Sequence, residues 1–306
     1  MSTVLASGAD ERYGHWLLNM VGSVQKNAPG VFDRIVLFDL GLTPLQERLA
    51  RAIRGAEVRT VPPFVAHWRE GRTWKTWIWT HVEAERLVWF DAGLSVLRPL
   101  DELVAQIDER GYFVVSQGVP VGECTPPEFY EELGFSHVDD DRTTVASGIL
   151  GFRTSGPFYS RVIVPTYEDA VQGRTLGFSA ADVDRINTGM DRNADPIIRD
   201  CRFFRWDQSV FNVRFYLAVD DPVVNDIDKF AGWKSATQHP EQVIWSHRRR
   251  GDFRFMPHIR YRGWLAPFGF VYGWGYRLNW WRVNHSWLFK PSTYARKAAR
   301  LLRLAP

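Results

Sequence analysis

The sequence has few cysteines and lacks any long apolar run. Its two cysteines among 306 residues, Cys124 and Cys201, form neither a disulfide framework nor a recognisable zinc-site spacing, so we expect free thiols in a reducing compartment. No uninterrupted apolar stretch reaches about 18 residues, and residues 1–10 lack the basic and apolar regions of a secretory signal. These absences predict a cytoplasmic protein without a transmembrane helix and leave peripheral contact with the inner face of the membrane open.

Aromatic residues are abundant, at 14% of the chain with 14 Trp. Aromatic rings fill cores, stack on sugars and bases, and lie at membrane interfaces, so composition alone does not choose among these uses.

Basic residues gather towards the C-terminal end. Residues 247–306 contain 13 Lys and Arg and one acidic residue, Asp252, which gives a net charge of +12. Because the whole chain carries +3, residues 1–246 carry −9. This asymmetry suggests a polyanionic partner for the tail.

Strands and helices alternate through the first half of the chain. Apolar periodicity predicts strands at Thr3–Ser7, Arg34–Asp39, Glu57–Val61 and Arg86–Phe90, and helices at 11–27, from Pro44 behind a Thr43 cap, and at Thr73–Glu85. Further strands are expected at Tyr112–Ser116 and Ser147–Phe152, and a helix opened by Asp207 is expected within Phe204–Tyr216. This order predicts an α/β fold with a mostly parallel central sheet and helices on both faces.

Ligands of such sheets bind beyond the carboxyl ends of the strands. Two strand ends are therefore candidates, Ala6-Ser7-Gly8 and Asp91-Ala92-Gly93. In the run LVWFDAGLSVLRPL (87–100), an apolar strand delivers the Asp91 carboxylate to its end. The two small residues that follow let a bulky ligand approach the backbone.

Three more motifs accompany this strand end: TWKTWIW at 73–79, SGILGF at 147–152 and DQSVFN at 207–212. Together and in this order, the four motifs resemble glycosyltransferases of the GT-A fold, the nucleotide-diphospho-sugar transferase superfamily. They resemble members with a Trp-Lys-Pro element before an "LDAG" strand end, and the resemblance covers residues 3–250. It implies a catalytic domain at 1–250, followed by a basic, aromatic-rich extension at 251–306.

The resemblance also implies an activity and a set of roles. The activity is transfer of a sugar from a nucleotide-sugar donor, a UDP-sugar, to a glycan or lipid-linked acceptor. In the implied site, Ala6, Ser7 and Gly8 bind the uridine and Tyr13 stacks on it. Lys75 and Asp91, with Ala92 and Gly93, bind the diphosphate. Ser147 and Gly148 contact the donor sugar, and Asp207 and Gln208 lie at the reaction centre.

One departure from the family concerns the metal. The usual motif is Asp-x-Asp, whereas this chain has Gly93 at the second position, and glycine offers no side-chain ligand. Mn²⁺ or Mg²⁺ held by Asp91 and His247 is one way to neutralise the leaving diphosphate. Lysine and arginine side chains, namely Lys75 and the basic residues 248–250, are another, so metal dependence stays open.

Structural roles compete with these functional ones. Asp91 could cap a turn, Lys75 could extend past an apolar helix face to solvent, and Asp207 could cap its helix. We expect Trp74, Trp77 and Trp79 to pack in the core or against helices. We also expect a solvated turn at Asp139-Asp140-Asp141 and a structural role for His247. If the enzyme inverts, the base is Asp207 or one of Asp182, Asp184 and Asp191.

Rival functions also stay open. A sugar nucleotidyltransferase would carry a Gly-rich basic loop after its first strand, and ASGADERYGHW at 6–16 does not match one. A non-catalytic nucleotide-sugar-binding protein is consistent with the missing second aspartate. The aromatic and basic segment 264–306 fits either peripheral membrane contact or packing on the domain. No nucleic-acid partner is expected, because residues 1–246 are acidic and no nucleic-acid-binding module is present.

Overall fold

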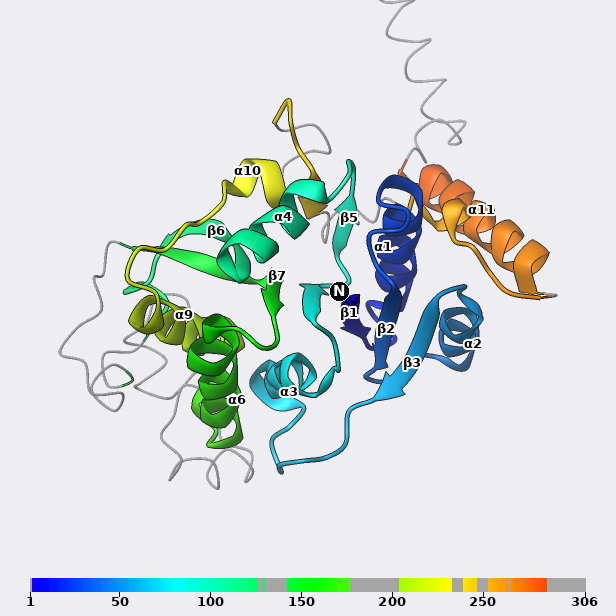
Figure 1. Cartoon of the computed structure of the whole chain (residues 1–306). Helices are drawn as coiled ribbons and strands as arrows, with labels where there is room; N and C mark the ends of the chain where they lie inside the picture. The colour runs from blue at the N-terminus through cyan, green and yellow to red at the C-terminus, as the bar shows by residue number, and fades with distance from the viewer. Residues whose placement is uncertain are drawn as a thin grey trace, which may run out of the picture.

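The computed structural model describes residues 2–125, 129, 142–176, 204–232, 239–246, 253–263 and 265–284. Its centre is a six-stranded sheet with the order β3-β2-β1-β4-β7-β6 (Figure 1). The strands of this sheet are β1 (Thr3–Ala9), β2 (Arg34–Asp39), β3 (Ala56–Thr60), β4 (Arg86–Phe90), β6 (Tyr112–Pro120) and β7 (Thr143–Arg153). Two short strands, β5 (Leu94–Val96) and β8 (Ile244–Ser246), form a separate antiparallel pair.

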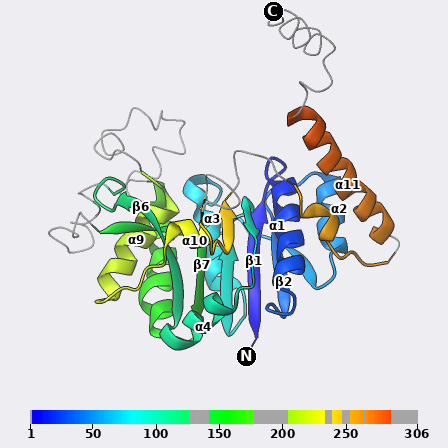
Figure 2. The same ribbon diagram turned by 90° about the horizontal axis from the view of Figure 1, so that it is seen from above.

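Helices cover both faces of the sheet (Figure 2). The α-helices are α1 (Gly14–Asn27), α2 (Pro44–Ala52), α3 (Thr73–His81), α4 (Asp101–Arg110), α6 (Val164–Val171), α9 (Asp207–Ala218), α10 (Ile227–Phe230) and α11 (Leu265–Asn284). Shorter turns are η1 (Glu70–Arg72), η2 (Tyr159–Ile163), η3 (Arg174–Leu176) and η6 (Met256–His258). The predicted α/β fold is confirmed.

The strand order places a topological switch point beside β1. Strands β3, β2, β1 and β4 run parallel, whereas β7 is antiparallel to both β4 and β6. From β1 the chain moves outward to β2 and β3, and it then returns to β4 on the other side of β1. In open α/β sheets, this reversal leaves a crevice at the carboxyl ends of the two strands.

Alternating side chains divide the core into two layers. Leu5 of β1 belongs to a buried cluster with α1, α2 and α4, whereas its neighbours Val4 and Ala6 belong to a second cluster with α3 and α9. Successive residues of a strand point to opposite faces, so an almost wholly apolar strand needs cover on both sides. The fully buried β1 meets this condition.

Two helix boundaries test the sequence predictions. Helix α2 begins as expected, because Thr43 and Gln46 form a capping box and Pro44 occupies the first turn. Helix α3 ends at His81 and not at Glu85, so that prediction is wrong at its end. The backbone carbonyls of Glu83 and Glu85 accept hydrogen bonds from Arg34 and Thr154, and these bonds hold the segment extended as it enters β4.

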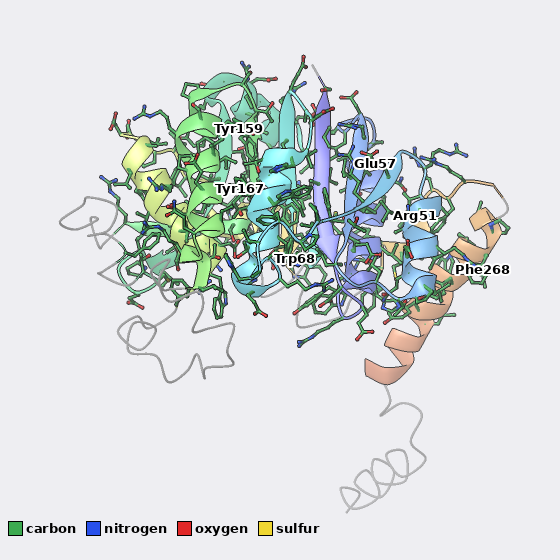
Figure 3. All side chains as sticks on the ribbon, turned by 90° about the horizontal axis from the view of Figure 1, so that it is seen from below. Arg51, Glu57, Trp68, Tyr159, Tyr167 and Phe268 are labelled. Atoms are coloured by element: carbon green, nitrogen blue, oxygen red, sulfur yellow. The ribbon has the colours of Figure 1, made fainter. Side chains whose placement is uncertain are left out.

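One side of α11 packs on the domain and the opposite side is exposed. His15 of α1 contacts the Tyr272 hydroxyl at 2.8 Å and stacks on the Tyr276 ring at 4.1 Å. The exposed residues include Phe268, labelled in Figure 3, together with Phe270, Val271, Trp274 and Leu278. Within the ranges that the structure describes, no helix has the length and hydropathy needed to cross a membrane. The division of the chain at residue 250 stays a prediction.

Candidate active site

A cavity of about 230 Å³ opens at the switch point between β1 and β4. Its lining comes from the ends of these two strands, from the loop between β1 and α1, from Leu40 after β2, and from the segment before α3 together with the first turn of α3. The lining residues are Gly8, Ala9, Asp10, Tyr13, Leu40, Trp68, Arg69, Arg72, Trp74, Lys75, Asp91, Ala92 and Gly93. Three cationic side chains and several aromatic rings therefore surround one space.

Six of the predicted donor-binding residues line this cavity: Gly8, Tyr13, Lys75, Asp91, Ala92 and Gly93. Ala6 and Ser7 lie deeper in β1, are fully buried, and do not line the cavity. The Ser7 hydroxyl has no hydrogen-bond partner among the residues that the structure describes. Strand β1 continues to Ala9, so its predicted end at Ser7 is wrong by two residues, and Gly8 and Ala9 are the β1 residues that meet the Asp91 end of β4 at the cavity.

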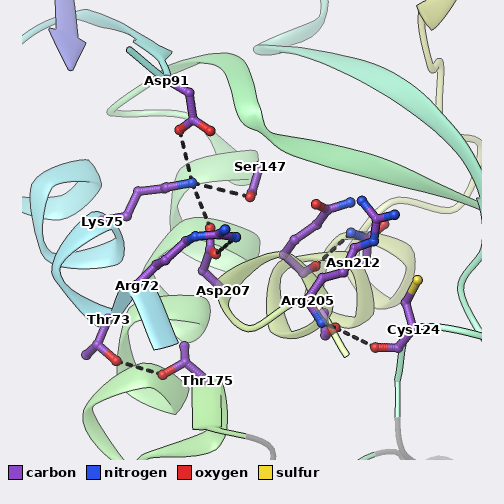
Figure 4. A network of polar contacts seen from close by, with 12 residues as sticks. Arg72, Thr73, Lys75, Asp91, Cys124, Ser147, Thr175, Arg205, Asp207 and Asn212 are labelled. Carbon is purple, nitrogen blue, oxygen red and sulfur yellow. Dashed lines mark hydrogen bonds and ion pairs between the residues drawn. The ribbon is translucent and has the colours of Figure 1, made fainter. Parts of the chain in front are cut away.

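Lys75 is the centre of the polar network beside the cavity (Figure 4). Its side-chain nitrogen lies 3.2 Å from Asp91 Oδ1, 3.0 Å from Asp207 Oδ2 and 3.5 Å from Ser147 Oγ. The residue is only 1% exposed. A lysine that extends past a helix face would place its ammonium in water, so that interpretation is wrong.

Asp207 is fully buried at the start of α9. It does not cap the helix, because the N-cap position is Trp206 and no side chain there accepts a capping bond. Neither Asp207 oxygen accepts a hydrogen bond of good geometry from the described residues; both instead face the cations Lys75 and Arg72. These two ion pairs offset the cost of burying the Asp207 carboxylate.

Arg72 is a site residue that the sequence analysis missed. It lines the cavity, and its Nη1 atom lies 3.6 Å from Asp207 Oδ1. Burial by itself would lower the pKa of Arg72, but the carboxylates of Asp207 and Asp91 outweigh burial and raise it. The guanidinium is therefore firmly cationic.

Arg69, Trp68 and Asp10 were missed as well. Arg69 and Trp68 lie on the segment after β3, and Asp10 follows β1. Segments after parallel strands gather at one edge of the sheet. Basic and aromatic residues between Thr60 and Thr73 could have been found by this criterion.

The backbone near this ion pair is unusual. Arg72 (φ 58°) and Trp206 (φ 58°) are the two non-glycine residues with positive φ among those the structure describes. Such a conformation costs about 1–3 kcal/mol and persists where the surroundings fix it. Thr73 helps to fix this region, because its hydroxyl lies 2.7 Å from the Thr175 hydroxyl (Figure 4).

The second-half motifs reach the same region. The Asp91 backbone N–H donates to the Gly148 carbonyl at 2.8 Å, which joins the β4 end to β7. Gln208 is 5% exposed and donates to Gln117 Oε1 of β6 at 2.7 Å. The structure therefore brings Ser147, Gly148 and Asp207 together with Lys75, whereas Gln208 lies to one side of them and does not line the cavity.

The tryptophans of α3 differ in their surroundings. Trp79 is fully buried and packs edge-on against Phe211, which confirms its predicted core role. Trp77 stacks on His81 at 4.3 Å between ring centroids. Trp74 packs near Trp89 but also lines the cavity, so helix packing is not its only role.

The described residues fit a divalent cation poorly. Within the described ranges, no three His, Cys, Asp or Glu side chains gather into a group that could hold a metal. Asp91 Oδ1 accepts a hydrogen bond from the Trp89 indole at 3.0 Å and pairs with Lys75. Magnesium and manganese need several oxygen ligands, and the described side chains alone do not supply such a set.

Several predicted residues lie outside the described residues. They are the metal candidate His247, the basic residues 248–250, the base candidates Asp182, Asp184 and Asp191, and the Asp139–Asp141 run. Their roles stay predictions.

Comparison with solved structures gives information on the fold. No family model matches the chain, and no curated protein sequence matches it. Among solved structures, it is similar to the galactosyltransferase LgtC in complex with donor and acceptor sugar analogues, with a TM-score of 0.50 and 12% identity over 90% of this chain and 95% of that chain.

Two other similarities have lower scores. The bifunctional glycosyltransferase WbbM gives a TM-score of 0.48 at 12% identity, over 90% of this chain and 44% of that chain. Mouse xyloside xylosyltransferase 1 gives 0.47 at 10% identity, over 81% and 97%. At such identities the likeness concerns the fold alone. The chain has the fold of GT-A-type glycosyltransferases.

Proposed function

We propose that the protein is a glycosyltransferase that moves a sugar from a nucleotide-sugar donor, a UDP-sugar, to a glycan or lipid-linked acceptor. One observation carries the proposal. The cavity at the switch point combines cations for a diphosphate, aromatic side chains for a base, and small residues at both strand ends. A nucleoside diphosphate has both a charged part and a planar ring, and it matches this combination.

Lys75 is assigned to the leaving group. As the sugar–phosphate bond breaks, negative charge grows on the diphosphate, and a fixed cation nearby lowers the barrier. Asp91 and Asp207 hold the ammonium from two sides at 3.2 and 3.0 Å, so it is positioned before the donor arrives. Asp207 therefore acts first as a positioning residue for Lys75. A role of Asp207 as a base, with Gln208 near the acceptor, stays a prediction.

We further propose that Asp91 and His247 bind a divalent metal ion. A divalent cation, when bound, would add positive charge beside the diphosphate. The position of Asp91 in the cavity lining supports this proposal.

A thermal-shift screen of nucleotide sugars and free nucleotides, with and without Mn²⁺, tests donor binding. A ligand that binds only the folded state raises the melting temperature. At a ligand concentration of 100 times its Kd, the added free energy of unfolding is roughly 2.7 kcal/mol. We expect a shift with UDP or one UDP-sugar. A metal role predicts that the Asp91→Ala variant loses the manganese-dependent part of this shift. Absence of any shift with all nucleotides would contradict the proposal.

A non-catalytic nucleotide-sugar-binding protein is the second candidate. The observation that favours it is Gly93, which replaces the second acid of the family motif at the cavity. Sugar release from the bound donor, followed with and without acceptor glycans, separates the two. Tight donor binding without any transfer or hydrolysis would favour the second candidate.

We also propose peripheral contact with an anionic membrane surface through α11. Five apolar side chains of this helix are exposed: Phe268, Phe270, Val271, Trp274 and Leu278. At 100° per residue, the last four share one side, opposite the packed Tyr272 and Tyr276. The net charge of +12 over residues 247–306 favours anionic lipid as the partner. This location would suit lipid-linked acceptors and a cytoplasmic enzyme at the inner face of the membrane.

Vesicle flotation tests the membrane contact. Vesicles containing phosphatidylserine should carry the full chain, whereas phosphatidylcholine vesicles should carry less. The Phe270→Glu/Leu278→Glu variant should float poorly, with Leu45→Glu, another exposed apolar residue, as the matched control. Equal flotation of both variants with the wild type would rule out this face.

A further inference from the structure

We infer that Arg72 is a second diphosphate-binding cation, which exchanges its ion pair with Asp207 for the phosphates of the donor. This inference rests on the proposed function, because it presupposes a nucleoside diphosphate in the cavity. Arg72 lies outside the four sequence motifs.

The three cavity cations differ in how they are held. Lys75 lies buried between two carboxylates, at 3.2 and 3.0 Å. Arg69 donates to the Leu40 carbonyl at 3.1 Å, and its guanidinium lies over the Trp68 ring at 4.4 Å. Arg72 has an exposed side chain, 46% accessible, and its ion-pair partner in the described chain is Asp207 at 3.6 Å. Arg72 is thus the least constrained of the three.

The chemistry of arginine fits this use. A guanidinium carries five N–H donors in a planar fork that matches two phosphate oxygens at once. The long contact to Asp207 involves Nη1 alone, and Arg72 lines the cavity, so its other donors are available to a ligand there. Asp207 does not lose its charge partner when Arg72 turns away, because it keeps Lys75 at 3.0 Å. The exchange therefore leaves no buried carboxylate unpaired.

The backbone adds independent support. Gly71 (φ 50°) and Arg72 (φ 58°) form a left-handed turn directly before α3. A Cβ at Gly71 would lie 2.6 Å from the Thr175 carbonyl oxygen, so the turn is pressed against η3. Strained conformations at non-glycine residues cluster at functional sites. Glycine would relieve the strain at position 72, yet the chain places an arginine there.

This same feature supplies a clean variant. Arg72→Gly removes the guanidinium but suits the left-handed backbone, so folding should not suffer. Arg72→Lys keeps the charge and loses the fork. Arg51→Gln, which removes an exposed arginine paired with Glu47 on α2, is the matched control.

The experiment is calorimetric titration of these proteins with UDP and with uridine, in buffer with EDTA and in buffer with Mn²⁺. We expect Arg72→Gly to bind UDP roughly 10- to 100-fold more weakly, with uridine affinity unchanged and the melting temperature not lowered. Arg72→Lys should fall between this variant and the wild type, and Arg51→Gln should match the wild type.

Two results would overturn the inference while donor binding stands. One is unchanged UDP affinity in Arg72→Gly. The other is an equal loss for UDP and uridine, which would mean that Arg72 only shapes the cavity. If the wild-type chain binds neither UDP nor any other nucleoside diphosphate, the proposed function itself fails, and the inference fails with it.

Discussion

Lys75 Nζ and Asp207 Oδ2 lie 3.0 Å apart, although 131 residues separate them in the chain. The lysine comes from α3 and the aspartate from the start of α9, and both are almost fully buried. Asp91 completes the group from the end of β4. This pair links the two halves of the chain beside the cavity, which Lys75 lines.

Removal of the Lys75 charge should destabilise the protein. In Lys75→Met, Asp207 stays buried with only the looser Arg72 contact, and loss of one partner of a buried ion pair costs about 3–5 kcal/mol. Urea unfolding measures the change in the free energy of unfolding. The double variant Lys75→Met/Asp207→Asn should recover much of the loss, because the uncompensated charge is gone. A single variant as stable as the wild type would contradict this account.

The contact between α1 and the C-terminal segment should be sensitive to one methyl group. A Cβ at Gly22 would lie 2.1 Å from the Phe255 carbonyl oxygen, so Gly22→Ala should cost about 1–3 kcal/mol through displaced backbone. Gly275→Ala in α11 is the matched control, because no atom lies within 4 Å of its Cβ position. It should be neutral or stabilise by about 0.5–1 kcal/mol. Similar melting temperatures for both variants would argue against close packing at Gly22.

Stability should fall in mild acid because of His15. Burial lowers the pKa of His15 from its ordinary value of 6.5. As pH falls, the unfolded chain therefore takes up a proton before the folded chain does. Neutral His15 contributes its full share of the folding stability above pH 6.5, and this share is lost as pH falls below that value. Its contacts to Gln46 (3.2 Å) and to the Tyr272 hydroxyl (2.8 Å) use both ring nitrogens.

Unfolding free energies of the wild type and of His15→Gln, measured between about pH 7.5 and 5, check this sign. The stability difference in favour of the wild type should shrink on acidification. A difference that grows at low pH would show that the protonated ring is the favoured form.

Tyr13 should contribute to base binding. Its ring lines the cavity and packs edge-on against Trp16 at 5.3 Å. Loss of an aromatic stacking partner typically costs about 1–3 kcal/mol per base, so Tyr13→Ala should weaken uridine binding, whereas Tyr13→Phe should retain it. Titration with uridine measures both affinities. Equal affinity of the alanine variant and the wild type would place the base elsewhere.

Local patterns predicted much of the sheet. The limits of Arg34–Asp39 and Arg86–Phe90 match β2 and β4, because both strands are short apolar runs bounded by polar or small residues. The Asp91 strand end was found in the same way. The end of α3 was missed, because hydrogen bonds from Arg34 and Thr154, distant in the chain, hold residues 83–85 extended.

The sequence by itself determined the class of fold and the strand ends where a ligand could bind, because burial on two faces and the alternation of elements are local properties of the chain. Only the tertiary structure decided which charges meet. Lys75 is buried between Asp91 and Asp207, and Arg72 reaches the cavity from a left-handed turn. These are contacts between elements far apart in the chain, and their geometry depends on how helices α3 and α9 pack on one face of the sheet.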